Sequence, residues 1–160
     1  MNPWDTNPFA LLTFIAAPAI LTNASSVMAL GTSNRFARAV DRARALGRAE
    51  ARTAPAATLR DRQLQAVGRR GLLLVRALTA FYLSVGAFAA ASLVSLLGAV
   101  AVATQQPTLR VVSFGVAMIA GVAGVGGLVA GSGILMWESR LTLRILRDEL
   151  AFRHDQPPAV

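Results

Sequence analysis

The sequence predicts an all-α membrane protein in which residues 1–160 form one domain with three transmembrane helices. Hydrophobic residues make up 54% of the 160 residues and charged residues only 15%, whereas a soluble domain carries about 25% charged residues. Three long stretches contain no charged residue: residues 9–31, 77–104 and 111–137. Each exceeds the roughly 20 residues of helix that cross a bilayer core. A soluble helical bundle would need polar faces, which these stretches lack.

The first stretch has one alternative reading, a cleaved signal peptide. The small residues Ala17-Pro18-Ala19 are typical of a cleavage site. A signal peptide begins with a positive region, but residues 1–8 contain Asp5 and no arginine. We therefore expect residues 9–31 to remain in the mature chain as a transmembrane helix.

The positive charge is concentrated in one segment. The net charge is +8, and all sixteen basic residues are arginines. Eleven of them lie in residues 35–76 with only three acidic residues, so this segment holds the whole net charge. Basic segments also bind nucleic acid, but here the segment lies between apolar stretches, and we expect no nucleic-acid partner. The positive-inside rule places residues 32–76 and the tail 138–160 in the cytoplasm and the N-terminus outside.

The cytoplasmic segment 32–76 is predicted to be a helical hairpin. Residues 34–52 repeat apolar side chains at helical spacing. Pro55 disfavours helix in the residue before it, and a second helix is expected from Leu59 into the next span. Residues 138–153 form an amphipathic helix that would extend the third span into the cytoplasm and pack on the hairpin.

Charged residues near the inner boundary supply a candidate basic site and a candidate latch. The basic site comprises Arg35, Arg38, Asp41, Arg42, Arg44 and Arg76. Such arginines attract anionic lipid of the cytoplasmic leaflet at about 1 kcal/mol each, or bind a cytoplasmic partner. Glu138, at the inner end of the third span, can pair with Arg35, Arg38 or Arg76. Such a pair is either structural or a latch that opens on a signal.

The stretch from Asn34 to Leu46 follows the pattern NRxxRxxDRxRxL, and a Trp-Glu pair ends the third span. These features resemble a bacterial family of small three-helix integral membrane proteins catalogued as a domain of unknown function. The resemblance covers nearly the whole chain and implies the bacterial inner membrane, but no activity. In topology only, the chain also resembles the ExbB/TolQ proton-channel subunits, which implies a pentamer.

Polar side chains in the first span are candidates for a pore lining. The candidates are Thr22, Asn23, Ser26 and Ser33. Asn23 lies near the middle of the span, where a polar group is costly unless it faces a partner or water. The alternative is that these groups bond to neighbouring helices or to their own backbone. If they line a pore, the arginines below form a positive vestibule, which favours anions.

Small residues spaced by four in the third span indicate close helix packing. Ala123, Gly127 and Gly131 share one face, and the two glycines form a GxxxG motif. This face packs either within one protomer or between protomers. Because three such helices bury little surface alone, we expect a homo-oligomer.

Enzyme chemistry is not expected. The chain has no cysteine and one histidine, His154, which lies in the tail. We therefore predict no catalytic residue, metal site or cofactor. The sequence favours a homo-oligomeric ion channel or pore with an arginine-lined cytoplasmic vestibule. The alternative is a non-conducting membrane scaffold or accessory subunit whose hairpin binds anionic lipid or a cytoplasmic partner.

Overall fold

Three long α-helices make up the part of the chain that the structure describes, residues 9–48 and 54–154. This computed structural model contains α1 (Phe9–Arg48), α2 (Ala54–Ala103) and α3 (Pro107–His154). At about 1.5 Å per residue, α2 is about 75 Å long, more than twice the thickness of a bilayer core. Each helix therefore has room for a membrane span and an extension beyond it.

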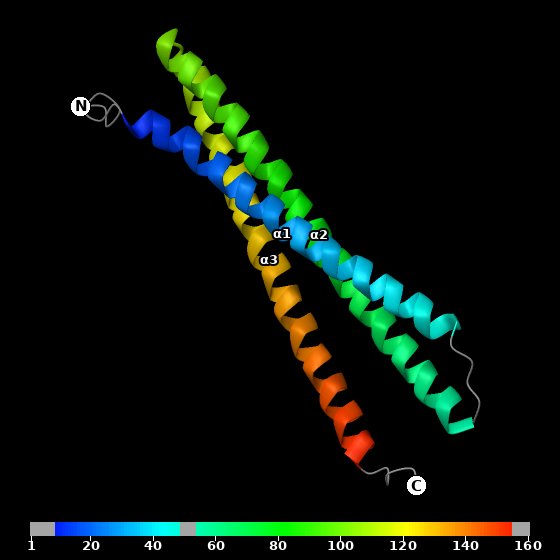
Figure 1. Cartoon of the computed structure of the whole chain (residues 1–160). Coiled ribbons are helices and arrows are strands. Elements are labelled where there is room, and N and C mark those ends of the chain that lie inside the picture. The colour runs from blue at the N-terminus through cyan, green and yellow to red at the C-terminus, as the bar shows by residue number, and fades with distance from the viewer. Residues whose placement is uncertain (1–8, 49–53, 155–160) are drawn as a thin grey trace.

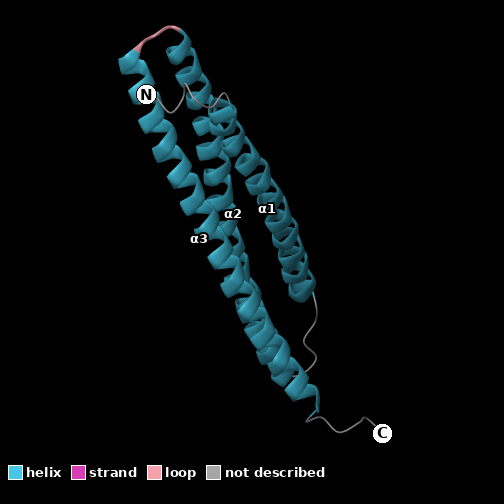
Figure 2. Cartoon of the chain, turned by 90° about the vertical axis from the view of Figure 1, so that its left-hand side faces the viewer, coloured by secondary structure: helices cyan, strands magenta, loops and turns pink. Residues whose placement is uncertain are grey.

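Helix α2 is the centre of the fold. Both α1 and α3 pack against α2 and make only weak contact with each other (Figures 1 and 2). The three helices meet midway, where Ala29, Ala77 and Phe81 are buried and Leu128 and Ile134 pack against them. Away from this point α2 accompanies α3 toward their connecting turn and α1 toward the other end.

Both extensions beyond the meeting point are helical. Helix α2 begins at Ala54 and not at the expected Leu59, because proline is tolerated in the first turn of a helix and Pro55 lies there.

The end of the helix predicted for residues 34–52 lies partly outside the described residues. Helix α3 extends to His154 as expected, but beyond Glu138 it diverges from α1 and α2. Straight helices that cross at an angle separate away from their contact, so the backbone of the tail runs apart from the hairpin on which it was predicted to pack (Figure 1).

Glycines on α3 bring its backbone close to α2. A Cβ atom on Gly131 would lie 2.6 Å from the ring of Phe81, and one on Gly124 would lie 2.7 Å from the ring of Phe88. Both rings are buried, at 0% and 1% exposure. A Cβ on Gly127 would likewise meet α2. The missing Cβ atoms of these glycines therefore leave room for atoms of α2 within one protomer.

This packing selects one of the two readings of the small-residue face. Of the three predicted residues, Gly127 and Gly131 face α2 inside the protomer. Ala123 is exposed on the surface of α3, and Gly124 occupies the packed position beside it. The GxxxG motif is thus used within the chain and no longer supports contact between protomers.

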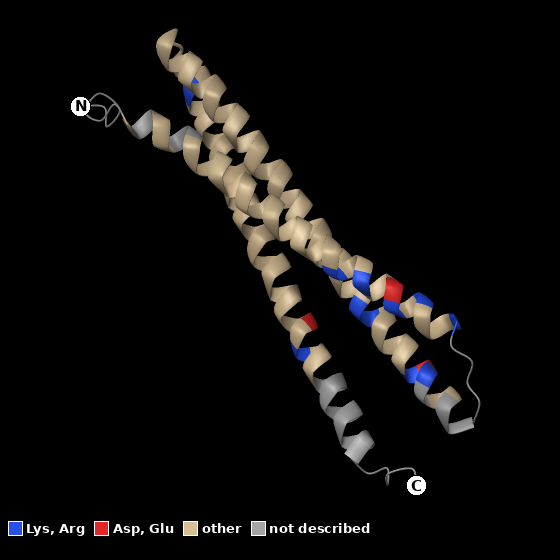
Figure 3. Cartoon of the chain, viewed as in Figure 1, with Lys and Arg blue, Asp and Glu red and all other residues tan. Residues whose placement is uncertain are grey.

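Two described segments are long and apolar enough to cross a membrane, by length and composition: Arg60–Ala103 and Pro107–Leu143. In the most apolar 18 residues of each segment, only 22% and 17% are buried in the protomer. A helix in the core of a soluble protein would be mostly buried. Helix α1 is not among these segments. Figure 3 shows that uncharged residues fill the middle of the molecule and that most charges gather at one end. We call the uncharged zone, residues 9–34, 77–103 and 111–137, the uncharged belt.

The turn between α2 and α3 allows a test of backbone strain. Gln105 has φ 56°, and hydrogen bonds run from the Gln105 N–H to the Val102 carbonyl and from the Gln106 N–H to the Ala101 carbonyl, at 3.2 and 3.0 Å. This is a Schellman helix end, whose left-handed residue is usually glycine. We expect Gln105→Gly to raise the free energy of unfolding by about 0.5 kcal/mol, because a side chain disfavours positive φ. SDS titration in mixed micelles measures it.

Gln106→Gly is the matched control, because Gln106 has no positive φ. That substitution relieves no strain, and it only increases the conformational entropy of the unfolded chain, which is destabilising. A stabilisation by Gln106→Gly as large as that by Gln105→Gly would contradict the assignment of strain to Gln105.

Candidate functional site

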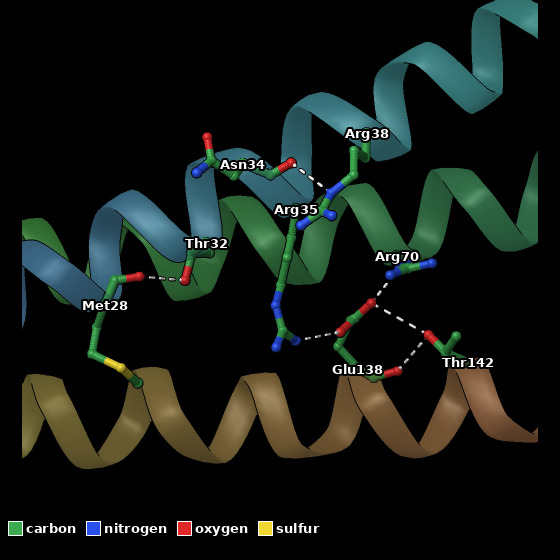
Figure 4. Close-up of polar contacts among 8 residues, drawn as sticks. All are labelled: Met28, Thr32, Asn34, Arg35, Arg38, Arg70, Glu138 and Thr142. Carbon is green, nitrogen blue, oxygen red and sulfur yellow. Dashed lines mark hydrogen bonds and ion pairs between the residues drawn. The ribbon is translucent and has the colours of Figure 1, made fainter.

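One buried carboxylate joins all three helices. Glu138 of α3 is 1% exposed. Its Oε2 lies 3.8 Å from a terminal guanidinium nitrogen of Arg35 on α1, and its Oε1 contacts Nε of Arg70 on α2 (Figure 4). The hydroxyl of Thr142, one turn further along α3, lies 3.0 Å from the backbone carbonyl of Glu138 and 3.3 Å from Oε1, and it can donate to either. We call Arg35, Arg70 and Glu138 the three-helix junction.

The charges of the junction differ in their access to water. The side chains of Arg35 and Arg70 are 46% and 32% exposed, whereas that of Glu138 is 1% exposed. The arginines keep part of their hydration, but the carboxylate has given up nearly all of its own. A buried charge is tolerated only when it is paired and hydrogen-bonded. The junction therefore holds α3 to α1 and α2 just before α3 diverges from them.

The partners of Glu138 were only partly anticipated. Of the three predicted arginines, Arg35 forms the ion pair, whereas Arg38 donates from Nε to the Asn34 carbonyl at 3.3 Å. Arg76 is exposed and forms no ion pair within the described residues. Arg70 was missed, although a signal exists in the sequence. Arg70 precedes the turn at 104–106 by nearly as many residues as Glu138 follows it. In two antiparallel helices joined by a turn, residues equally far from the turn lie side by side.

The rest of the predicted basic site lies on exposed helix surface. Asp41 and Arg44 form an ion pair at 4.0 Å, with both side chains largely exposed, and Arg42 is exposed. Other arginines lie close to the junction residues along each of the three helices. We call this group the arginine collar, and its members are Arg35, Arg38, Arg69, Arg70, Arg76 and Arg140.

The collar lies at the edge of the uncharged belt. Arg76 directly precedes the α2 part of the belt, and Arg35 directly follows the α1 part. From Arg76 to Arg69 the helix rises about 10 Å. The buried acidic residue at this level, among those described, is Glu138. The collar is thus a narrow, strongly basic band where an apolar zone ends.

Two of the four predicted pore residues, Thr22 and Ser26, bond to their own helix. The hydroxyl of Thr22 donates to the Pro18 carbonyl, and that of Ser26 donates to the Thr22 carbonyl, each at 2.9 Å. Asn23 and Ser26 are exposed on the outside of the protomer, and Ser33 is half-buried. Within one protomer, the hydroxyls of Thr22 and Ser26 therefore agree with the alternative, in which such groups bond to their own backbone. Among the described residues, no three His, Cys, Asp or Glu side chains group to hold a metal.

Comparison with known proteins identifies the family. Residues 15–148 match the family model described as Protein of unknown function (DUF2721). The chain belongs to this family. The match includes the arginine motif of α1 and all of the three-helix junction, and it confirms the resemblance to a family of unknown function drawn from that motif. No curated protein and no solved structure matches the chain, so the DUF2721 description comes without an activity.

Proposed function

We propose that this DUF2721 protein spans a bacterial inner membrane three times, with the N-terminus outside and the C-terminus in the cytoplasm. Helices α2 and α3 contain the two apolar segments long enough to cross. The third span is α1, which is uncharged over residues 9–34 and packs beside α2 at the same level, with Ala29 against Ala77. The arginines then face the cytoplasm, in agreement with the positive-inside rule.

The function that the geometry supports best is that of a non-catalytic scaffold anchored by anionic phospholipid. The observation that carries this proposal is the arginine collar, with six arginines from three helices in one band at the edge of the uncharged belt. That band coincides with the headgroup layer when the belt fills the bilayer core. Guanidinium groups bind phosphate through two parallel hydrogen bonds, and each is worth about 1 kcal/mol near an anionic surface.

Lipid binding by the collar is tested with two matched triple variants. Arg38, Arg69 and Arg76 belong to the collar but not to the junction, so their replacement by glutamine spares Glu138. At about 1 kcal/mol per arginine, the triple variant should bind phosphatidylglycerol about 100-fold more weakly. Native mass spectrometry of the protein in detergent, titrated with phosphatidylglycerol, counts the bound lipid.

The control removes the same charge further from the belt. Arg44, Arg48 and Arg62 lie beyond the collar on α1 and α2, each at a helical rise of about 9 Å or more from the nearest collar arginine. That distance exceeds the screening length of about 8 Å at physiological salt. The control triple variant should therefore keep lipid affinity within about threefold. Equal losses in both variants would show a diffuse charge effect, and phosphatidylcholine binding as strong as phosphatidylglycerol binding would refute the proposal.

A channel formed by several protomers is the second candidate. The observation in its favour is that Asn23 and Ser26 are exposed within the uncharged belt. A ring of protomers with α1 inward would bring these polar groups to a shared axis, above a vestibule of collar arginines. Conductance in planar bilayers tests this function, and Asn23→Leu should lower it. Undiminished conductance in that variant would count against a pore lined by α1.

A further inference from the structure

The outward face of α1 carries a regular stripe that the described parts of α2 and α3 leave exposed. Its members are Ile20, Asn23, Val27, Leu30 and Asn34, and all five are exposed. They lie opposite the residues that α1 buries against α2, which include Ser25, Ala29 and Thr32. We call these five residues the outer stripe.

Asn23 is the residue of the outer stripe that most needs a partner. Within the described part of the chain its side chain makes no hydrogen bond, whereas neighbouring hydroxyls bond to their own backbone. It lies near the middle of the α1 part of the uncharged belt. In hydrocarbon, the two N–H donors and the carbonyl acceptor of a side-chain amide have no water to bond to. A second asparagine amide satisfies those groups, because each amide both donates and accepts.

The spacing of the outer stripe points to a second copy of the same helix. Its residues are alternately three and four positions apart, which is the heptad spacing of a left-handed helix pair. Ile20 and Val27 share one heptad position and Leu30 lies at the other, a combination that favours two strands in parallel coiled coils. Copies of one chain cross a membrane in the same direction, so two α1 helices would run parallel. A two-fold axis along the membrane normal then brings Asn23 to Asn23.

We propose that two copies of this protein pair through α1, with the outer stripes in contact and Asn23 hydrogen-bonded to its symmetry mate. The pairing rests on the proposed function in one respect, namely that α1 spans the membrane. Interhelical hydrogen bonds matter there because burial of apolar side chains gives little drive between helices in lipid. The lipid-binding collar lies beyond this interface.

The absence of native cysteine makes cross-linking a direct test. Val27→Cys and Leu30→Cys place single thiols on the outer stripe, whereas Ala24→Cys and Gly31→Cys place them on exposed positions beside it. Oxidation in native membranes should give a dimer band for the two stripe variants and at least fivefold less for the two neighbours. Equal cross-linking at all four positions, or none at the stripe, would overturn the proposed pair.

The role of Asn23 is measured separately in the Val27→Cys background. Asn23→Leu should lower the cross-linked fraction about three- to tenfold, and Asn23→Gln, which keeps the amide, should restore most of it. An unchanged fraction in Asn23→Leu would overturn the hydrogen-bonded contact. A Leu30→Cys, Ala24→Cys double variant that gives a ladder of several protomers would replace the pair by a ring.

Alkaline carbonate extraction of the same membranes separates this inference from the proposed function. Protein that resists extraction but does not cross-link at the stripe would refute the α1 pair and leave the membrane scaffold standing. Protein that carbonate extracts would refute the membrane-spanning arrangement, and the pair with it.

Discussion

Replacing Arg35 and Arg70 together by glutamine is expected to lower the free energy of unfolding by about 3–5 kcal/mol. The double variant leaves the carboxylate of Glu138 buried, at 1% exposure, with Thr142 as its hydrogen-bond donor. Breaking a buried ion pair by removing one side is costly because an uncompensated charge stays away from water. SDS titration in mixed micelles, followed by tryptophan fluorescence, measures the change.

The decisive comparison adds Glu138→Gln to that double variant. The triple variant removes the stranded charge, which is the main cost of breaking a buried ion pair from one side. We therefore expect it to recover most of the lost stability, so that three substitutions cost less than two. Simple additivity, with the triple variant the least stable of all, would contradict a charge-paired junction.

Single variants should rank by contact and burial. Arg70→Gln is expected to cost more than Arg35→Gln, because Arg70 contacts the carboxylate more closely and is less exposed. The matched control is the Arg38→Gln, Arg69→Gln double variant, which removes the same charge from exposed neighbouring positions. Substitutions at exposed sites outside such clusters change stability by about 0.5 kcal/mol or less. A control as damaging as the junction variant would assign the loss to net charge.

The helices and the uneven charge were predictable because they depend on local sequence. Uncharged stretches long enough to cross a bilayer mark α2 and α3, and the cluster of arginines marks the end at which the helices project. The start of α2 was misplaced because Pro55 signals either a break or a first turn, and local sequence does not separate these outcomes. The side of the membrane and the span of α1 stay predictions.

The contacts between helices were harder to predict because they depend on register and rotation. Arg35 as a partner of Glu138 follows from their shared position at the end of the uncharged belt. Choosing Arg70 over Arg76 requires the alignment of α2 with α3, which no single stretch of sequence contains. The same holds for Gly124 and Ala123, which are adjacent small residues on α3. A rotation of one residue decides which of them faces α2.

Replacing Gly131 by alanine is expected to destabilise the protein by about 1–3 kcal/mol, although alanine is the better helix former. In an open helix position the exchange gains about 1 kcal/mol. At Gly131 the new Cβ would lie 2.6 Å from the ring of Phe81, which is itself fully buried. Either the buried ring must shift or α2 and α3 must separate, and overpacking of this kind costs about 1–3 kcal/mol.

Gly133 supplies the control that fixes the sign of this effect. It lies two residues further along α3 and is exposed, and a Cβ there meets nothing within 4 Å. Gly133→Ala should therefore raise the free energy of unfolding by up to about 1 kcal/mol, while Gly131→Ala lowers it. Adding Phe81→Leu to Gly131→Ala makes room for the methyl group, so the double variant should lose less than the sum of its two single variants. Strictly additive losses, or a stabilised Gly131→Ala, would show that α3 does not pack on α2 through this glycine.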